Sequence, residues 1–272
     1  MKVLVTGVKG QLGHDVVNEL CARGIEAVGV DVEEMDITDG QCVDKMLSSV
    51  HPDAVIHCAA WTAVDAAEDP ENIEKVRLVN VQGTKNIAKA CRAIGSKMMY
   101  ISTDYVFDGQ GTEPWEADCK KYAPLSVYGR TKLEGELAVA EALDAYFIVR
   151  IAWVFGINGK NFVKTMLALS EKYESLRVVD DQIGTPTYTF DLARLLVDMI
   201  ETDKYGYYHA TNEGGYISWA DFAKEIFRQA GMPTKVVPVT TSAYGLSKAA
   251  RPFKSRLDKR KLVECGFVLL PD

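Results

Sequence analysis

Short apolar runs alternate with amphipathic stretches over residues 1–150 of the chain. The runs predict five strands, at residues 3–6, 27–30, 54–58, 98–102 and 146–150. Between them, apolar residues recur at helical spacing, at Leu12, Val16, Val17 and Leu20 and again at Val79, Ile87, Cys91 and Ile94. Strands that alternate with helices are typical of βαβ units around a parallel sheet. The pattern therefore predicts an α/β fold with a doubly wound parallel sheet, in which the apolar stripes form the core.

The alternation loosens after residue 150. Helices are predicted at residues 162–171, 190–201 and 219–230, and prolines punctuate the segments between them. No repeat or low-complexity linker separates the two parts, so residues 151–272 are expected to pack on the first domain as a smaller α/β part. Exchange of a strand and a helix between the parts stays open. A cleft between them is the expected place for a small ligand.

The composition narrows the class of protein. The 272 residues are 47% hydrophobic and 25% charged, which is typical of a soluble globular protein. The net charge of −7 disfavours nucleic acid as a partner. No apolar run is long enough for a membrane span or a leader peptide, so we expect a cytoplasmic protein. The six scattered cysteines form no C-x-x-C pair and predict reduced thiols with no metal site. A homodimer stays open.

A glycine-rich loop follows the first predicted strand. Residues 6–13 read TGVKGQLG and lead directly into a predicted helix. Glycines allow a tight turn and close backbone approach, while the helix amino end supplies free N–H groups for a pyrophosphate. The spacing G-x-x-G-x-x-G departs from the common G-x-G-x-x-G, but its strand–loop–helix setting favours a Rossmann-type dinucleotide-binding domain over a structural turn. The expected cofactor contacts in the loop are Gly7, Gly10, Gln11, Leu12 and Gly13.

A carboxylate at the end of the second strand bears on the choice of cofactor. Asp31 can accept hydrogen bonds from the adenosine ribose hydroxyls and would repel a 2′-phosphate, which favours NADH. Lys9 could partly compensate that phosphate, so NADPH stays open. Further cofactor contacts are expected at Asp36, Ile37, Ala59 and Ala60. For Asp36, a turn or helix-capping role is an equal alternative.

Three residues form a candidate catalytic group. Tyr128 and Lys132 are spaced i, i+4 and would share one helix face. A nearby ammonium would lower the pKa of the phenol from its usual value of about 10, so that Tyr128 could exchange a proton near neutral pH. Thr103 closes the fourth strand, at the sheet edge where such folds bind ligands, and could donate a hydrogen bond to a carbonyl oxygen. The combination is far more specific than a lone Y-x-x-x-K.

These segments together resemble the extended short-chain dehydrogenase/reductase family. The resemblance spans nearly the full chain. It rests on residues 6–13, 59–65 (AAWTAVD), 102–109 (STDYVFDG), 124–132 (PLSVYGRTK), 150–156 (RIAWVFG), 181–187 (DQIGTPT), 251–252 (RP) and 255–258 (SRLD).

The resemblance implies an NAD(P)H-dependent reductase that acts on the C4 ketone of a dTDP-4-keto-6-deoxy sugar. The implied substrate is dTDP-4-dehydro-L-rhamnose, reduced to dTDP-L-rhamnose for cell-surface polysaccharide. Tyr128 would protonate the ketone oxygen, Thr103 would polarise it, and Lys132 would bind the nicotinamide ribose and tune Tyr128. The resemblance also places Asp104, Tyr105 and Trp153 against the sugar. For Trp153, a core position is an equal alternative.

A basic stretch lies near the end of this acidic chain. Residues 248–261 read KAARPFKSRLDKRK, in which Asp258 is the single acid. Arginine forks suit a nucleotide pyrophosphate, and Arg251 and Arg256 are the expected contacts. A solvated charged tail is the equal alternative.

Other functions of related chains stay open to different degrees. Nucleotide-sugar dehydratases of the superfamily have a glutamate where this chain has Tyr105, so the base for dehydration is missing. An epimerase is excluded less cleanly. A non-catalytic regulatory subunit on the same fold is a further alternative, because fold does not determine function. Retention of Thr103, Tyr128 and Lys132 favours an enzyme, since a binding module needs no such group.

Overall fold

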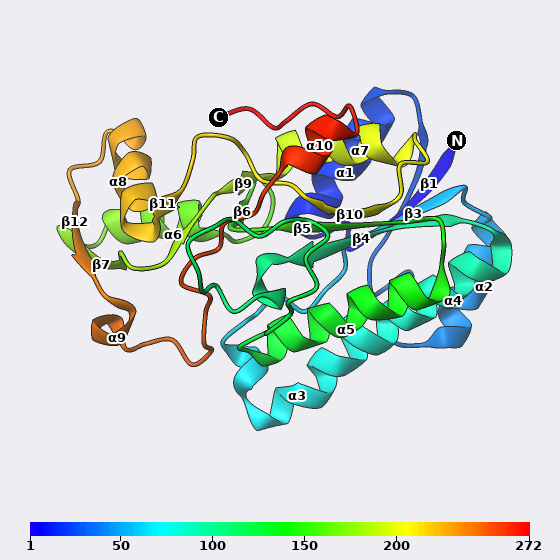
Figure 1. Ribbon diagram of the computed structural model, residues 1–272, viewed down its shortest axis with the longest axis horizontal. Coiled ribbons are helices and arrows are strands. Elements are labelled where there is room, and N and C mark those ends of the chain that lie inside the picture. Colours follow the sequence, from blue (N-terminus) through cyan, green and yellow to red (C-terminus); the bar gives the residue numbers. More distant parts are fainter.

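A six-stranded parallel sheet forms the centre of the protein in a computed structural model that describes residues 1–272. Its strand order is β10-β5-β4-β3-β1-β2, and every neighbouring pair is parallel (Figure 1). The strands are β1 Lys2–Thr6, β2 Glu26–Val30, β3 Ala54–His57, β4 Lys97–Thr103, β5 Tyr146–Ile151 and β10 Gly206–His209. The five predicted strands are confirmed. The order changes direction between β1 and β3, which opens a crevice at the carboxyl ends of the strands.

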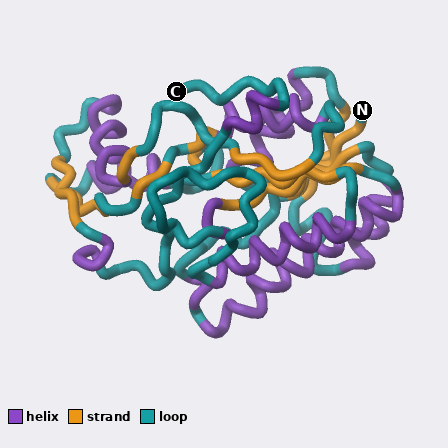
Figure 2. The backbone as a smooth tube through the Cα atoms, viewed as in Figure 1, coloured by secondary structure: helices purple, strands orange, loops and turns teal.

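Helices cover both faces of this sheet, and Figure 2 shows them in purple above and below the orange strands. One face carries α1 Gln11–Ala22 and α7 Thr189–Ile200, and the other carries α2 Gly40–Val50, α4 Thr84–Ile94 and α5 Val127–Ala142. In β1, Val3 and Val5 belong to the core of the first face, whereas Leu4 belongs to that of the second. Side chains alternate along a strand, so a fully apolar strand feeds two cores at once. The helix α3 Pro70–Arg77 continues through a π-helical turn, Leu78–Gly83, into α4.

The second half of the chain contributes to both ends of the molecule. Its strand β10 and helix α7 join the central sheet, while a smaller core packs α6 Phe162–Ser170 and α8 Trp219–Ala230 beside a parallel strand pair. The three helices predicted beyond residue 150 are confirmed as α6, α7 and α8. The remaining elements are β6 Val154–Phe155, β7 Ser175–Val179, β8 Ile183–Gly184, β9 Thr187–Tyr188, β11 Ile217–Ser218, β12 Lys235–Val239, α9 Thr241–Tyr244 and α10 Arg260–Glu264. None of the helices combines the length and apolarity needed to cross a bilayer.

A fully buried ion pair ties α5 to the sheet. Arg150 on β5 donates from Nε to Glu136 Oε1 at 2.8 Å and from Nη2 to Glu136 Oε2 at 2.7 Å. Both side chains are completely buried. Ser102 Oγ on β4 donates to the same carboxylate at 2.5 Å. Two strands and one helix are thus joined at a single carboxylate, immediately beside the candidate catalytic residues.

Two buried histidines predict a dependence of stability on pH. Burial lowers the pKa of His57 and of His209 to about 3, from 6.5, with nearby positive charge from Lys132 and Arg150 acting in the same direction. The unfolded chain binds a proton at each site near pH 6.5, and the folded chain does not. The free energy of unfolding should therefore fall as the pH decreases below 6.5, by up to about 1.4 kcal/mol per pH unit for each histidine.

Urea unfolding between about pH 5 and 8 measures this slope. The exposed His14 and His51 provide a matched control, because a variant with both changed to Gln should keep the wild-type slope. A free energy of unfolding that does not change over this range would contradict the prediction.

Candidate active site

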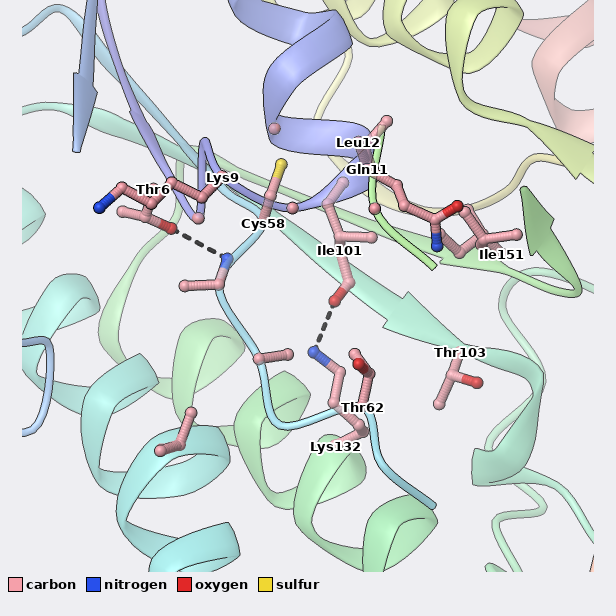
Figure 3. Close-up of a pocket in the computed structure, with 18 of the residues that line it drawn as sticks. Thr6, Lys9, Gln11, Leu12, Cys58, Thr62, Ile101, Thr103, Lys132 and Ile151 are labelled. Atoms are coloured by element: carbon pink, nitrogen blue, oxygen red, sulfur yellow. Dashed lines mark hydrogen bonds between the residues drawn. The ribbon is translucent and has the colours of Figure 1, made fainter. Parts of the chain in front are cut away.

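A cavity of about 770 Å³ lies at the carboxyl ends of the sheet strands. Figure 3 shows side chains from the glycine loop, the strand ends and α5 converging on it. The structure brings most of the predicted site residues together in its lining: Gly7, Gly10, Gln11, Leu12, Gly13, Asp31, Asp36, Ile37, Ala59, Ala60, Thr103, Asp104, Tyr105, Tyr128, Lys132 and Trp153. Arg251 and Arg256 are not among the lining residues.

The glycine loop is shaped for close approach of a ligand. Gly7 has a φ of 71°, and a Cβ there would lie 2.8 Å from the backbone of Ala59. A Cβ on Gly13 would lie 2.3 Å from the carbonyl oxygen of Gly7. The helix α1 begins after Gly10, which provides no side-chain cap, so N–H groups of its first turn stay free. These features fit the pyrophosphate of a dinucleotide.

The carboxylate after β2 is held by backbone amides. Asp31 Oδ2 accepts from Lys9 N and its Oδ1 accepts from Val32 N, each at 2.9 Å. The Lys9 ammonium forms an ion pair with Glu33. The carboxylate therefore has a defined direction at the rim of the cavity, and the cation that could compensate a 2′-phosphate already has an acidic partner.

Asp36 makes the contacts of a turn residue and also lines the cavity. Its Oδ1 accepts from Thr38 N at 2.9 Å and from Thr38 Oγ1 at 2.7 Å, which makes it a turn residue. It also lines the cavity together with Ile37. Binding of the adenine by these two residues stays a prediction.

The three candidate catalytic side chains come from two elements. Thr103 is the last residue of β4, and Tyr128 and Lys132 lie in the first turns of α5. Ser126 caps this helix by accepting from Gly129 N at 3.1 Å. Lys132 Nζ donates to Ile101 O at 2.7 Å, as drawn in Figure 3. The cap and the strand end thus bring hydroxyl, phenol and amine into one cavity.

The expected effect of Lys132 on Tyr128 is wrong for this structure. Burial raises the pKa of the Tyr128 phenol well above its usual value; the nearby Thr103 hydroxyl opposes this rise, and the charge of Asp104 adds to it. Burial also lowers the pKa of Lys132 to about 7, although Glu136 opposes that change. Tyr128 is consequently a protonated phenol throughout the neutral range.

The residues expected against the sugar border the same cavity. Asp104 is buried, and burial raises its pKa to about 6. Tyr105 packs edge to face on Tyr128 with ring centroids 5.5 Å apart. Trp153 has a φ of 49°, unusual for a residue other than glycine, and stacks on Trp219 with ring centroids 3.7 Å apart. Trp153 therefore has one face in a small aromatic core and still lines the cavity.

The two arginines predicted to bind the pyrophosphate have partners elsewhere in the protein. Arg251 binds Asp65 through Nη1 at 3.0 Å and Nη2 at 2.6 Å. Arg256 Nη2 donates to Gly111 O at 3.0 Å. These contacts tie the C-terminal segment to the loops that contain Asp65 and Gly111. Binding of a pyrophosphate by Arg251 and Arg256 stays a prediction.

A segment before α6 reaches the cavity without having been predicted there. Asn158 Nδ2 donates to Lys9 O at 2.9 Å and to Gly10 O at 3.1 Å. Asn161 Nδ2 donates to Gln11 Oε1 at 3.0 Å. The available sequence signal is Asn161, which directly precedes an apolar helix and is typical of an N-cap. Its contact with the glycine loop depends on how the second half of the chain folds back.

A doubly wound sheet, a glycine loop and a strand-end threonine beside a Tyr/Lys pair define an extended short-chain dehydrogenase/reductase. A family model described as "RmlD substrate binding domain" matches residues 1–272. The chain is 42% identical over 270 residues to a dTDP-4-dehydrorhamnose reductase of Streptomyces griseus, covering 97% of this chain and 87% of that protein. It is 40% identical over 265 residues to the spore coat polysaccharide biosynthesis protein SpsK of Bacillus subtilis, covering 97% and 92%.

A solved structure agrees with these relatives. The dTDP-4-dehydrorhamnose reductase of Bacillus anthracis, in complex with NADP, superposes with a TM-score of 0.95 at 40% identity, covering 100% of this chain and 96% of that one. The chain belongs to the dTDP-4-dehydrorhamnose reductase family of the extended short-chain dehydrogenases/reductases.

Proposed function

We propose that the protein catalyses the NAD(P)H-dependent reduction of the C4 ketone of dTDP-4-dehydro-L-rhamnose to dTDP-L-rhamnose. The observation that carries this proposal is the meeting of Thr103, Tyr128 and Lys132 with the glycine loop in one cavity. Full-length relatives named as dTDP-4-dehydrorhamnose reductases support it, as does the NADP complex of the Bacillus anthracis enzyme.

Each catalytic side chain has a distinct task in this reaction. When bound, the reduced nicotinamide supplies the hydride that reduces the sugar C4. Tyr128 protonates the ketone oxygen, for which its raised pKa keeps the phenol in the acid form. Thr103 donates a hydrogen bond that polarises the same oxygen. Lys132 holds the nicotinamide ribose from the next turn of α5.

The remaining lining residues divide between cofactor and sugar. The glycine loop binds the pyrophosphate, Asp31 the adenosine ribose, and Asp104, Tyr105 and Trp153 the sugar. In this proposal residues 1–150 hold mainly the cofactor and residues 151–272 mainly the substrate. We also place the reaction in the cytoplasm and propose a homodimer, which light scattering tests directly.

Asp31→Ala is expected to raise the Kd for NADH about tenfold, because hydrogen bonds from ribose hydroxyls to a carboxylate are lost. NADPH should be affected less, since the substitution also removes repulsion of the 2′-phosphate. Fluorescence titration with each cofactor measures the two affinities. Asp31→Asn, which keeps an acceptor without the charge, serves as the control. Equal losses for both cofactors would show that Asp31 does not contact the ribose.

The reaction itself is tested by absorbance loss of the reduced nicotinamide when the protein meets dTDP-4-dehydro-L-rhamnose, with NADH and NADPH in separate cuvettes. Stoichiometric oxidation with formation of dTDP-L-rhamnose supports the proposal. No oxidation by a folded protein that binds NADH would overturn it and favour an epimerase or a regulatory subunit.

A further inference from the structure

Residues 253–257 pass the carboxyl end of β4 as an extended segment held on two sides. In Figure 1 this segment lies between α9 and α10. On one side Ser255 N donates to Ile183 O at 2.7 Å, and on the other Lys254 N donates to Gly109 O at 3.0 Å. The backbone of Ser255 is therefore fixed by contacts that do not involve its side chain.

The hydroxyl of Ser255 is directed at a buried carboxylate of the active site. Ser255 Oγ donates to Asp104 Oδ2, and Thr103 Oγ1 donates to Asp104 Oδ1 at 2.9 Å. Relative exposure is 4% for Ser255, 3% for Asp104 and 5% for Thr103. Hydrogen bonds are thus the interactions that favour the charged form of this carboxylate.

The Thr103 hydroxyl carries one hydrogen and can donate only one hydrogen bond at a time. In this structure it goes to Asp104, while the Thr103 oxygen accepts from Tyr105 N at 3.3 Å. In the proposed reaction the same hydrogen is needed at the ketone oxygen. Asp104 must then lose Thr103 as a donor, and Ser255 is the side-chain donor that remains.

We propose that Ser255 is a positioning residue of the active site, which keeps Asp104 ionised and in place while Thr103 turns its hydrogen to the substrate. This inference rests on the proposed reductase activity. An ionised Asp104 can accept hydrogen bonds at both carboxylate oxygens, including one from a sugar hydroxyl. A protonated Asp104 carries a hydrogen on one of these oxygens and is a weaker acceptor. Removal of a donor from a buried carboxylate favours its protonated form.

The sign of the pH effect follows from this arrangement. Activity that requires ionised Asp104 is lost as the pH falls through its pKa of about 6. The titratable side chains that face Asp104 are Tyr105 and Tyr128, and burial raises the pKa of both, so they stay neutral in this range. Loss of the Ser255 hydroxyl should move the acid limb of the pH profile of kcat to higher pH by about one unit.

The test compares pH profiles of kcat with dTDP-4-dehydro-L-rhamnose and saturating NADH in wild type and variants. Ser255→Ala should lower kcat about tenfold on the acid limb, below the wild-type midpoint, and leave the KM for NADH unchanged. Ser255→Thr, which keeps the hydroxyl, should recover most of the rate. Ser247→Ala, in the same C-terminal segment but exposed, should match wild type.

A measurement without substrate separates this inference from the proposed function. In protein with ¹³C-labelled aspartate carboxyls, the NMR signal that disappears in Asp104→Asn reports its titration, and Ser255→Ala should raise the midpoint. Superimposable pH profiles in an active enzyme, or an unchanged midpoint, would overturn the role of Ser255. An inactive wild type would instead overturn the proposed reaction, and the NMR midpoint alone would decide the link between Ser255 and Asp104.

Discussion

Tyr128→Phe is expected to lower kcat by about a hundredfold or more and to leave the affinity for NADH nearly unchanged. The substitution removes the proton that the ketone oxygen takes up and keeps the ring that packs on Tyr105 at 5.5 Å. Because burial raises the pKa of Tyr128, its ionisation should not limit the wild-type rate at neutral pH. Single-turnover kinetics measure the chemical step, and fluorescence titration measures NADH binding.

Tyr173→Phe is a suitable control for this variant, since Tyr173 is 55% exposed and does not line the cavity. It should match wild type in both measurements. A Tyr128→Phe enzyme with wild-type turnover would remove Tyr128 from the mechanism. A large loss of NADH affinity would point to a role in cofactor binding in place of proton donation.

Arg150→Met is expected to lower the free energy of unfolding by about 3–5 kcal/mol. The substitution leaves the Glu136 carboxylate buried with Ser102 as its remaining side-chain donor. Removing both charges avoids this penalty, so the double variant Arg150→Met/Glu136→Leu should recover much of the loss. Urea unfolding near neutral pH gives the free energies for wild type, both single variants and the double variant.

The double variant makes this prediction specific to the buried charge. A loss below about 1 kcal/mol in Arg150→Met would show that Glu136 is not isolated from water. Equal losses in the single and double variants would indicate a packing defect in place of an unpaired charge. Glu136 lies one turn beyond Lys132 on α5, so the pair also holds the catalytic helix against the sheet.

Local sequence signals predicted the positions of the main strands and helices well. The strands were recognised as short apolar runs, most of which are buried in the central sheet, and α1 because its apolar residues recur at helical spacing. The glycine-loop residues that line the cavity could be predicted from local sequence as well, because a helix that begins immediately after a strand exposes its amino end at the sheet edge. The spacing of Tyr128 and Lys132 placed both side chains at one cavity.

Properties that depend on distant parts of the chain could not be predicted in this way. The i, i+4 spacing suggested that Lys132 would lower the pKa of Tyr128, but Lys132 donates to Ile101 O and burial dominates both groups. The ion pair of Arg251 with Asp65 likewise joins residues far apart in the sequence, and it could not be predicted from the basic stretch. The contact of Ser255 with Asp104 could not be predicted either, because the two residues are 151 positions apart.

The sequence by itself determined the α/β class, the positions of the strands, the loop that fits a dinucleotide and the identity of the three candidate catalytic residues. Periodicity, glycine conformation and spacing along one helix are local properties, so they do not depend on how distant parts of the chain pack. The tertiary structure alone decided which polar groups are desolvated, which of them are paired, and which segment of the second half closes on the active site. Desolvation and pairing depend on what packs around a group in three dimensions, which neighbours in the sequence do not specify.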